Sequence, residues 1–186
     1  MATVNLHPNG LEENAWTINP GPPSGPIAQA AMADSDDSTV LREPDQNSYA
    51  IFTLDDYTSG GTIDSIRWYV RATMFSTRSS AHNTAIQVTL GNGSHTSSSS
   101  GTSYYDENVT VEFQGGYAQN DYFGTVRAND GSSDWNTASL NALRLDVNTS
   151  PADPPAISQI MMAKCYVEVT YTAAVTDNAT FFGANF

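Results

Sequence analysis

The sequence predicts an all-β protein, an antiparallel β-sandwich of jelly-roll type. Several stretches alternate apolar and polar residues with a period of two, which is typical of strands with one buried face. Glycine, proline and asparagine separate these stretches at short intervals, and helix-forming residues are scarce, since Lys164 is the only lysine. No alternation of strands with long helical stretches is present, so we expect antiparallel sheets. Two sheets packed face to face bury such alternating faces best.

The longest alternating stretch is Ser158–Tyr171, which follows a proline-rich break. One parity, expected to face the core, carries Met161, Ala163, Cys165, Val167, Val169 and Tyr171. The other parity carries Met162, Lys164, Tyr166, Glu168 and Thr170. We expect a central strand, the last of the sandwich, that pairs with 63–74 or with 143–147.

The other elements follow from the same pattern in chain order. Within Tyr49–Leu54, the side chains of Ala50, Phe52 and Leu54 are expected to face inward, and Leu143–Val147 repeats this pattern. We also expect Asp134 to cap a short helix from Trp135 to about Asn141. The complete set of further expected strands is Thr3–His7, Ala15–Ile18, Thr39–Leu41, Tyr49–Leu54, Ile63–Met74, Thr84–Leu90, Asn108–Phe113, Tyr122–Ala128 and Leu143–Val147.

Three segments are predicted. Residues 1–38 form an N-terminal strand and a connector, because Pro20–Pro26 has four prolines and two glycines and cannot hold a helix or a central strand. Residues 39–171 form the β-sandwich. Residues 172–186 form a C-terminal arm with a small, polar beginning and an aromatic end.

Charge and hydropathy exclude two classes of partner. The formal net charge is −13 with only seven basic residues, so neither nucleic acid nor an anionic membrane surface is an expected partner. No apolar run reaches the length of a transmembrane helix, and the N-terminus has no features of a secretory signal peptide. We therefore expect no membrane attachment.

The sequence contains no pattern that favours catalysis or a cofactor. The three histidines are far apart, and no zinc, phosphate-binding or nucleophile motif is present. Cys165 is expected to be a buried structural thiol. Asp34–Asp37 and Asn129–Asp134 are rich in oxygen ligands, but solvated turns explain them better than calcium sites. We expect no enzyme, no cofactor and no metal.

Aromatic residues in polar surroundings are the candidates for partner binding. Tyr104 and Tyr105 lie in a region rich in Gly, Ser and Asn, where such rings either stack on sugars, anchor a protein interface or serve as ordinary sheet residues. Trp16 anchors a short extended piece near the N-terminus. Phe181, Phe182 and Phe186 end the arm, and three exposed phenylalanines are costly unless they fold back or dock. We favour docking on another chain.

The chain resembles the β-sandwich virion proteins of tailed bacteriophages, of the head-decoration, head-fibre or tail-associated type. The similarity rests on Thr62–Ala72, Trp135–Val147, Ile157–Ile160 and Tyr166–Tyr171, within a region from about Thr39 to Tyr171. It implies a non-enzymatic, oligomeric structural role without a cofactor. No functional residue carries over, because these motifs are strand patterns.

Two functions are therefore expected, in order. The first is a virion structural protein that binds and stabilises the capsid or tail surface as a decoration or cement protein. Its partners would be the major capsid or tail protein and further copies of itself. The alternative is a carbohydrate-binding or receptor-binding module of a phage tail or head fibre, with a host surface glycan as its ligand.

Overall fold

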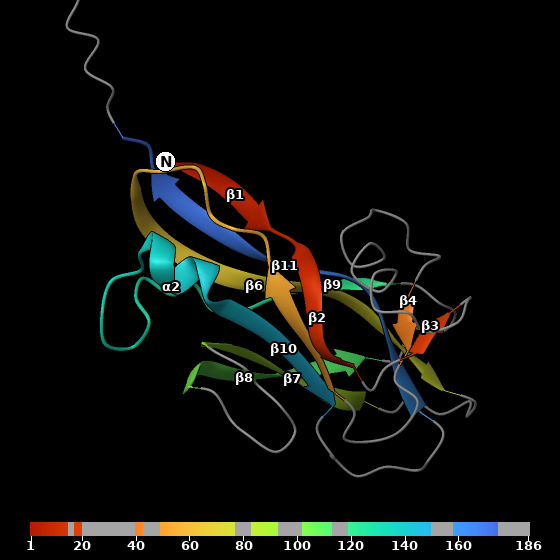
Figure 1. Ribbon diagram of the computed structural model, residues 1–186. Helices are drawn as coiled ribbons and strands as arrows, with labels where there is room; N and C mark the ends of the chain where they lie inside the picture. The colour runs from red at the N-terminus through yellow and green to blue at the C-terminus, as the bar shows by residue number, and fades with distance from the viewer. Residues whose placement is uncertain are drawn as a thin grey trace, which may run out of the picture.

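The computed structural model describes residues 1–14, 17–19, 40–42, 49–76, 83–92, 102–112, 119–149 and 158–174. These residues form two antiparallel sheets that pack face to face, with one short helix at the end of the sandwich (Figure 1). The all-β sandwich predicted from the alternating pattern is confirmed. Trp16, Pro20–Pro26 and the arm beyond Ala174 lie outside this part of the chain.

The first sheet has the order β3-β4-β11-β6-β9, and β1 also pairs with β11. The second sheet has the order β2-β5-β10-β7-β8. The strands of the first sheet are β1 (Ala2–Leu6), β3 (Thr17–Asn19), β4 (Val40–Arg42), β6 (Thr62–Ser76), β9 (Asn120–Phe123) and β11 (Ser158–Thr172). Those of the second sheet are β2 (Pro8–Asn14), β5 (Tyr49–Leu54), β7 (Asn83–Asn92), β8 (Thr102–Glu112) and β10 (Leu143–Thr149).

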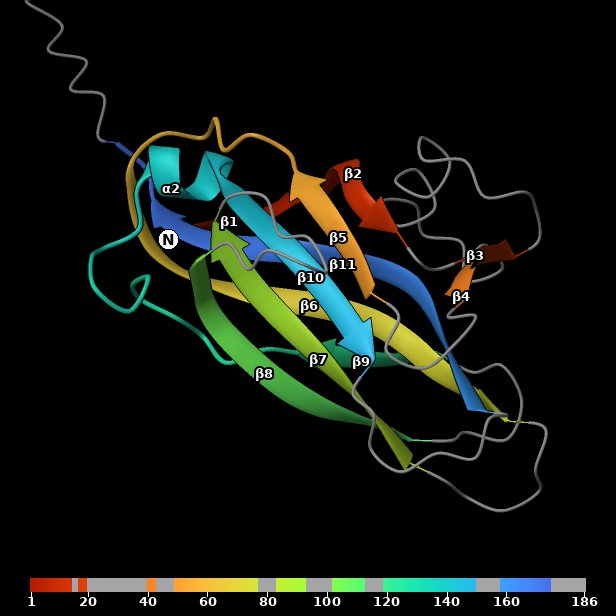
Figure 2. The same cartoon turned by 60° about the horizontal axis from the view of Figure 1, so that its bottom comes forward.

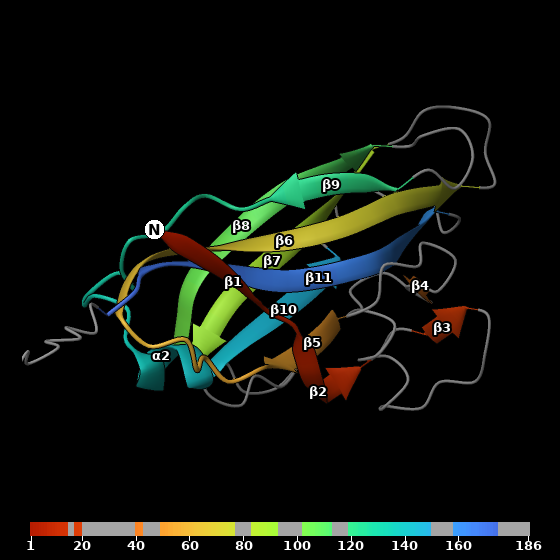
Figure 3. The same ribbon diagram turned by 90° about the horizontal axis from the view of Figure 1, so that it is seen from above.

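The strand order is that of a jelly roll. From β4 to β11 the chain alternates between the sheets, except where β7 and β8 pair as neighbours. The result is β4-β11-β6-β9 facing β5-β10-β7-β8, the two four-stranded sheets of that topology. Figure 2 shows β5, β10, β7 and β8 in front, and Figure 3 looks onto β1, β11, β6 and β9.

The prediction for the long C-terminal strand is right in extent and wrong in part of its inner face. A register shift lies between Met162 and Lys164, where β11 has one residue more than β6. Such a bulge inverts the alternation of side chains. Cys165, Val167 and Val169 join the main core as predicted. On the N-terminal side of the bulge, Ile160 and Met162 join it, although neither was predicted to face inward. Met161 and Ala163 instead form a small separate cluster with Val40.

The pairing prediction for this strand is half right. β11 pairs with β6 along the whole strand, from Ser158 opposite Ser76 to Thr172 opposite Thr62. It does not pair with β10, which belongs to the other sheet and faces β11 across the core. Residues before 39 contribute three strands where two were predicted. β1 matches the predicted Thr3–His7, β3 overlaps the predicted Ala15–Ile18, and β2 adds an unpredicted edge strand beside β5.

Two predicted elements near residue 130 need correction. The strand expected at Tyr122–Ala128 is β9, which begins earlier and ends at Phe123. The helix, α2 (Thr137–Asn141), is capped by Asn136 and not by Asp134. Asn136 Oδ1 accepts the Ser139 N–H, and Ser139 Oγ accepts the Asn136 N–H, both at 3.0 Å. This reciprocal capping box satisfies two backbone donors, the N–H groups of Asn136 and Ser139. The single carboxylate of Asp134, two residues earlier, would not satisfy both.

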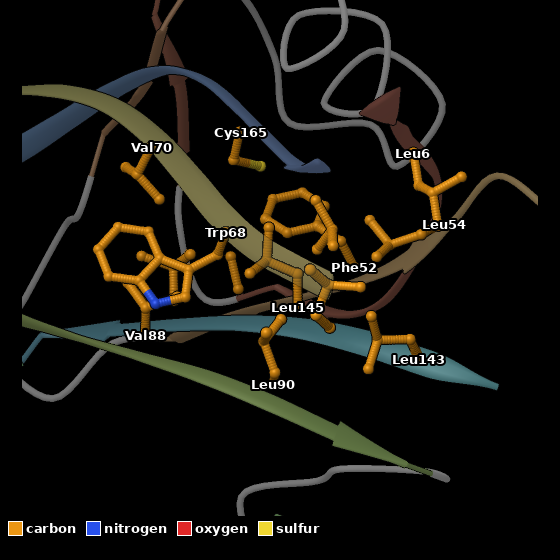
Figure 4. Close-up of a cluster of buried hydrophobic side chains, with 14 of the residues drawn as sticks. Leu6, Phe52, Leu54, Trp68, Val70, Val88, Leu90, Leu143, Leu145 and Cys165 are labelled. Carbon is orange, nitrogen blue, oxygen red and sulfur yellow. The ribbon is translucent and has the colours of Figure 1, made fainter. Parts of the chain in front are cut away.

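The core lies between the sheets (Figure 4). Trp68 and Val70 of β6 and Cys165 of β11 come from one sheet; Phe52 of β5 and Leu145 of β10 come from the other. All five are essentially inaccessible to solvent. Burial raises the pKa of the Cys165 thiol, so it stays protonated and packs as a small apolar group, as expected.

Gly124 ends β9 because the chain there runs against the indole of Trp68. The Gly124 N–H donates to the Trp68 carbonyl at 2.9 Å. A methyl group added at Gly124 would overlap Nε1 of Trp68 and lie 2.5 Å from Cδ1 and Cε2. Only a residue without a side chain fits, and the chain next pairs with β6 at Arg127 opposite Ile66.

We predict that Gly124→Ala lowers the free energy of unfolding by about 1–3 kcal/mol, because the methyl group overpacks the site against a buried indole. Urea denaturation followed by circular dichroism would measure the loss. The exposed Ala128→Ser, four positions further along the same connector, serves as the control and should leave the midpoint unchanged. Equal midpoints for Gly124→Ala and the parent chain would contradict the steric account.

Candidate functional site

Most of the residues predicted to bind a partner lie outside the part of the chain that the structure describes. This holds for Trp16, Phe181, Phe182 and Phe186, so their docking role stays a prediction. The acidic turn Asp34–Asp37 also lies outside it. The backbone of Tyr104 belongs to β8, but its side chain is not among those described.

Tyr105 is the one predicted binding residue whose side chain is described, and it packs partly buried against the core. Its hydroxyl donates to the Asn129 carbonyl at 2.6 Å. The guanidinium of Arg127 lies over its ring, 4.2 Å from the centroid. One ring face and the hydroxyl are therefore already occupied, as in an ordinary sheet residue. A role in binding stays a prediction for Tyr105.

Glu107 links the second sheet to the first. It lies on β8, and its carboxylate accepts hydrogen bonds from Trp68 Nε1 at 2.8 Å, the Thr125 N–H at 3.0 Å and Arg127 Nη2 at 2.6 Å. Burial alone would raise the pKa of Glu107. The bonds from Thr125, Arg127 and Trp68 outweigh it and hold the pKa below its ordinary value. The charged form of Glu107 therefore fastens β8 to β6 and to the connector after β9.

A row of aromatic rings crosses the outer face of the first sheet. It runs from His7, just after β1, through Tyr166 of β11 and Tyr69 of β6 to Phe123 of β9. Tyr69 and Tyr166 stack with centroids 4.3 Å apart, while His7 lies 5.5 Å from Tyr166 and Phe123 lies 5.1 Å from Tyr69. These side chains alternate with the core residues Trp68 and Val167, so they point away from the core on the side seen in Figure 3.

Ion pairs flank the row on both sides. Arg67 Nε lies 2.7 Å from Glu168 Oε1, and its guanidinium covers Phe123 at 4.6 Å from the ring centroid. Arg71 Nη1 lies 2.6 Å from Asp121 Oδ1, which also accepts the Tyr69 hydroxyl at 2.7 Å. The polar groups of this surface thus hold one another and fix the rings in place.

The pKa shifts on this face follow from the same packing. Burial, then the hydrogen bond to Asp121, raises the pKa of Tyr69 far above its ordinary value. Burial, then the neighbouring Glu168, raises the pKa of Tyr166. Burial, then Lys164, lowers the pKa of His7. His7 is therefore neutral at pH 7 and both tyrosines keep their protons, so none of these rings is charged there.

The arrangement offers ring edges rather than free ring faces. Tyr69 and Tyr166 cover each other, and Arg67 covers Phe123, yet 48% of the Phe123 surface remains exposed. A sugar ring binds by lying on an open aromatic face, and this row leaves few such faces free. An exposed apolar ring with charged and polar groups around it is typical of protein interfaces.

Sequence reasoning missed this row, although part of its signal was visible. The alternation of 63–74 places Arg67, Tyr69 and Arg71 on one face, and that of Ser158–Tyr171 places Tyr166 and Glu168 on another. Only the register of β6 with β11, which sets Tyr69 opposite Tyr166, joins the two faces. The contribution of β9 depends on its pairing Tyr69 with Phe123.

The described residues contain no group of three or more His, Cys, Asp or Glu side chains arranged to hold a metal ion. In the turn Asn129–Asp134, Asp130 Oδ1 accepts the N–H groups of Ser132 and Ser133, as expected for a turn. No helix in this part of the chain is long and apolar enough to cross a membrane.

Comparison with known proteins adds little. No protein-family model matches the chain, and no curated protein matches it. A solved structure described as the crystal structure of the Agl-KA catalytic domain is similar with 13% sequence identity and a TM-score of 0.49. The match covers 97% of this chain but only 30% of that one. Similarity at this level assigns no function.

We predict that Glu107→Gln lowers the free energy of unfolding at pH 7 by about 1–3 kcal/mol, since three donors lose a charged acceptor. Because folding lowers the pKa of Glu107, its charge stabilises the fold above the unfolded-state pKa and stops doing so as the pH falls through the folded-state value. The gap between the two proteins should therefore close in acid. Urea titrations between pH 7 and pH 3 would measure it, and a gap independent of pH would contradict the role of the charge.

Proposed function

We propose that this chain is a non-enzymatic virion structural protein that binds and stabilises the surface of a phage particle, as a capsid decoration or cement protein. Its partners would be a major capsid or tail protein and further copies of itself. It would be assembled in the host cytoplasm and reside in the virion. The resemblance of its strand patterns to phage β-sandwich proteins first suggests this role.

The aromatic row on the outer face of the first sheet carries the proposal. Its charged groups pair with one another, as Arg67 does with Glu168 and Arg71 with Asp121. They are thus arranged to fix a surface rather than to act on a reactant. The exposed ring of Phe123 lies at the edge of that surface, where an apolar group of a protein partner can cover it.

The jelly-roll topology is compatible with this role and does not prove it. Viral capsid domains, lectins and cupins all share it, so the fold alone leaves the function open. The carbohydrate-binding alternative needs aromatic faces open to a sugar. Tyr69, Tyr166 and Tyr105 each have a ring face covered by another side chain, which weighs against it.

We predict that replacing Phe181, Phe182 and Phe186 together by serine abolishes association with the particle. If these three rings dock on another chain, as predicted, their replacement removes the apolar surface that the contact buries. Particles carrying the parent or variant chain would be purified on a gradient, and the chain would be quantified by mass spectrometry.

The control for this experiment is the fold of the variant itself. Its near-ultraviolet circular dichroism and its urea midpoint should match those of the parent chain, so that lost binding is not lost folding. Thr176→Ser, which keeps a hydroxyl at a position in the same segment, should leave occupancy unchanged. Unchanged occupancy of the triple variant would refute docking by the arm, and absence of the parent chain from purified particles would refute the virion role.

A further inference from the structure

We infer that two copies of this chain pair through the outer face of the first sheet. This inference deepens the proposed function, since it names the surface behind its oligomeric contacts and rests on that proposal for its biological setting. We use the name outer face for the side chains of His7, Arg67, Tyr69, Arg71, Asp121, Phe123, Val126, Lys164, Tyr166 and Glu168. They come from β6, β9, β11 and the residues next to β1 and β9.

Exposed apolar surface is concentrated on this face. Among the described residues, the large hydrophobic side chains that remain exposed are Met1, Phe123 and Val126. Phe123 stands opposite Tyr69 on β9, and Val126 follows it where the connector pairs with β6 again at Arg127. They are 48% and 59% exposed. Two such side chains three positions apart along one sheet edge favour a contact that removes them from water.

The charge of the outer face identifies the occupant. The face carries three cationic side chains, Arg67, Arg71 and Lys164, and two anionic ones, Asp121 and Glu168, so its formal charge is +1. The whole chain carries −13, so the remainder carries −14. Two copies therefore repel each other through most of their surfaces and least through this one.

Mixed charge favours a second copy over an acidic partner. A surface built for an acidic protein or an anionic polymer would show unpaired cations. On the outer face two of the three cations, Arg67 and Arg71, already contact Glu168 and Asp121, so the excess of positive charge is limited to Lys164. A two-fold axis brings the same patch against itself, so each copy would offer both signs of charge to the other. Such a surface is complementary to itself.

The face is also rigid enough to bind without much reordering. Stacking fixes Tyr69 against Tyr166, and the Tyr69 hydroxyl is bound to Asp121. The Arg67 side chain is held between Glu168 and Phe123. Because these side chains are ordered before association, pairing costs less side-chain entropy than it would on a loose surface.

We predict that the full chain is a dimer in solution and that Phe123→Asp weakens its self-association at least about tenfold, the size of effect expected when a charge replaces an apolar side chain buried by the contact. Sedimentation equilibrium over a range of protein concentrations would measure the dissociation constant. Val126→Asp, at a residue with no contact in the core, is the second variant and should act in the same direction. It keeps the test valid if Phe123→Asp perturbs the ring row.

The matched control places the same charge on the other sheet. Thr110 of β8 is exposed and, three positions after Glu107, points to the opposite side of the strand, so Thr110→Asp changes the net charge equally without touching the outer face. Its dissociation constant should match that of the parent chain. Equal weakening by Thr110→Asp would attribute the effect to net charge and overturn the inference.

Two other results would overturn it. A parent chain that stays monomeric at about 100 μM, well above the range of a stable specific dimer, has no such pairing. A monomeric chain whose Phe123→Asp variant loses particle association would assign the face to a particle protein instead. Failure of the proposed function gives a different result. A chain that dimerises through this face but never associates with particles would support the inference and refute the virion role.

Discussion

The antiparallel pairing of β6 with β11 is the interaction on which the rest of the structure depends. These are the two longest strands among the described residues, each of 15 residues, and they lie at the centre of the first sheet. Their inner sides supply Trp68 and Val167 to the core, and their outer sides supply Tyr69 and Tyr166 to the aromatic row. One register therefore decides both faces, since a shift of one residue would exchange them.

A bulge in β11 lets this pairing serve two different environments. Toward the C-terminal end, Cys165 and Val167 face the main core. On the N-terminal side of the bulge, Met161 and Ala163 pack with Val40 in a separate cluster. The side of β11 that points away from the main core is therefore apolar at this end and aromatic and charged at the other. The extra residue costs ladder hydrogen bonds locally. The residue alternation of the sequence is the same along the whole strand, and the bulge lets its two ends bury opposite sides.

The second sheet is closed onto the first by packing and by one polar cluster. Apolar side chains from β5, β7 and β10 cover Trp68, and the indole N–H that packing alone would leave unpaired is taken by Glu107. The same carboxylate binds the connector after β9. That connector carries Val126 and directly follows Phe123, the last residue of β9, so the Glu107 cluster helps to place both residues exposed on the outer face.

The sequence by itself determined the all-β class, the positions of most strands and the buried state of Cys165, because a period of two and the choice of turn residues are local properties. It did not determine the bulge at Ala163, the partner of β11 or the helix cap at Asn136. Nor did it assemble the aromatic row, because Tyr69 and Tyr166 are almost a hundred residues apart in the chain. Strand register places them together, and register is set by the packing of both sheets at once.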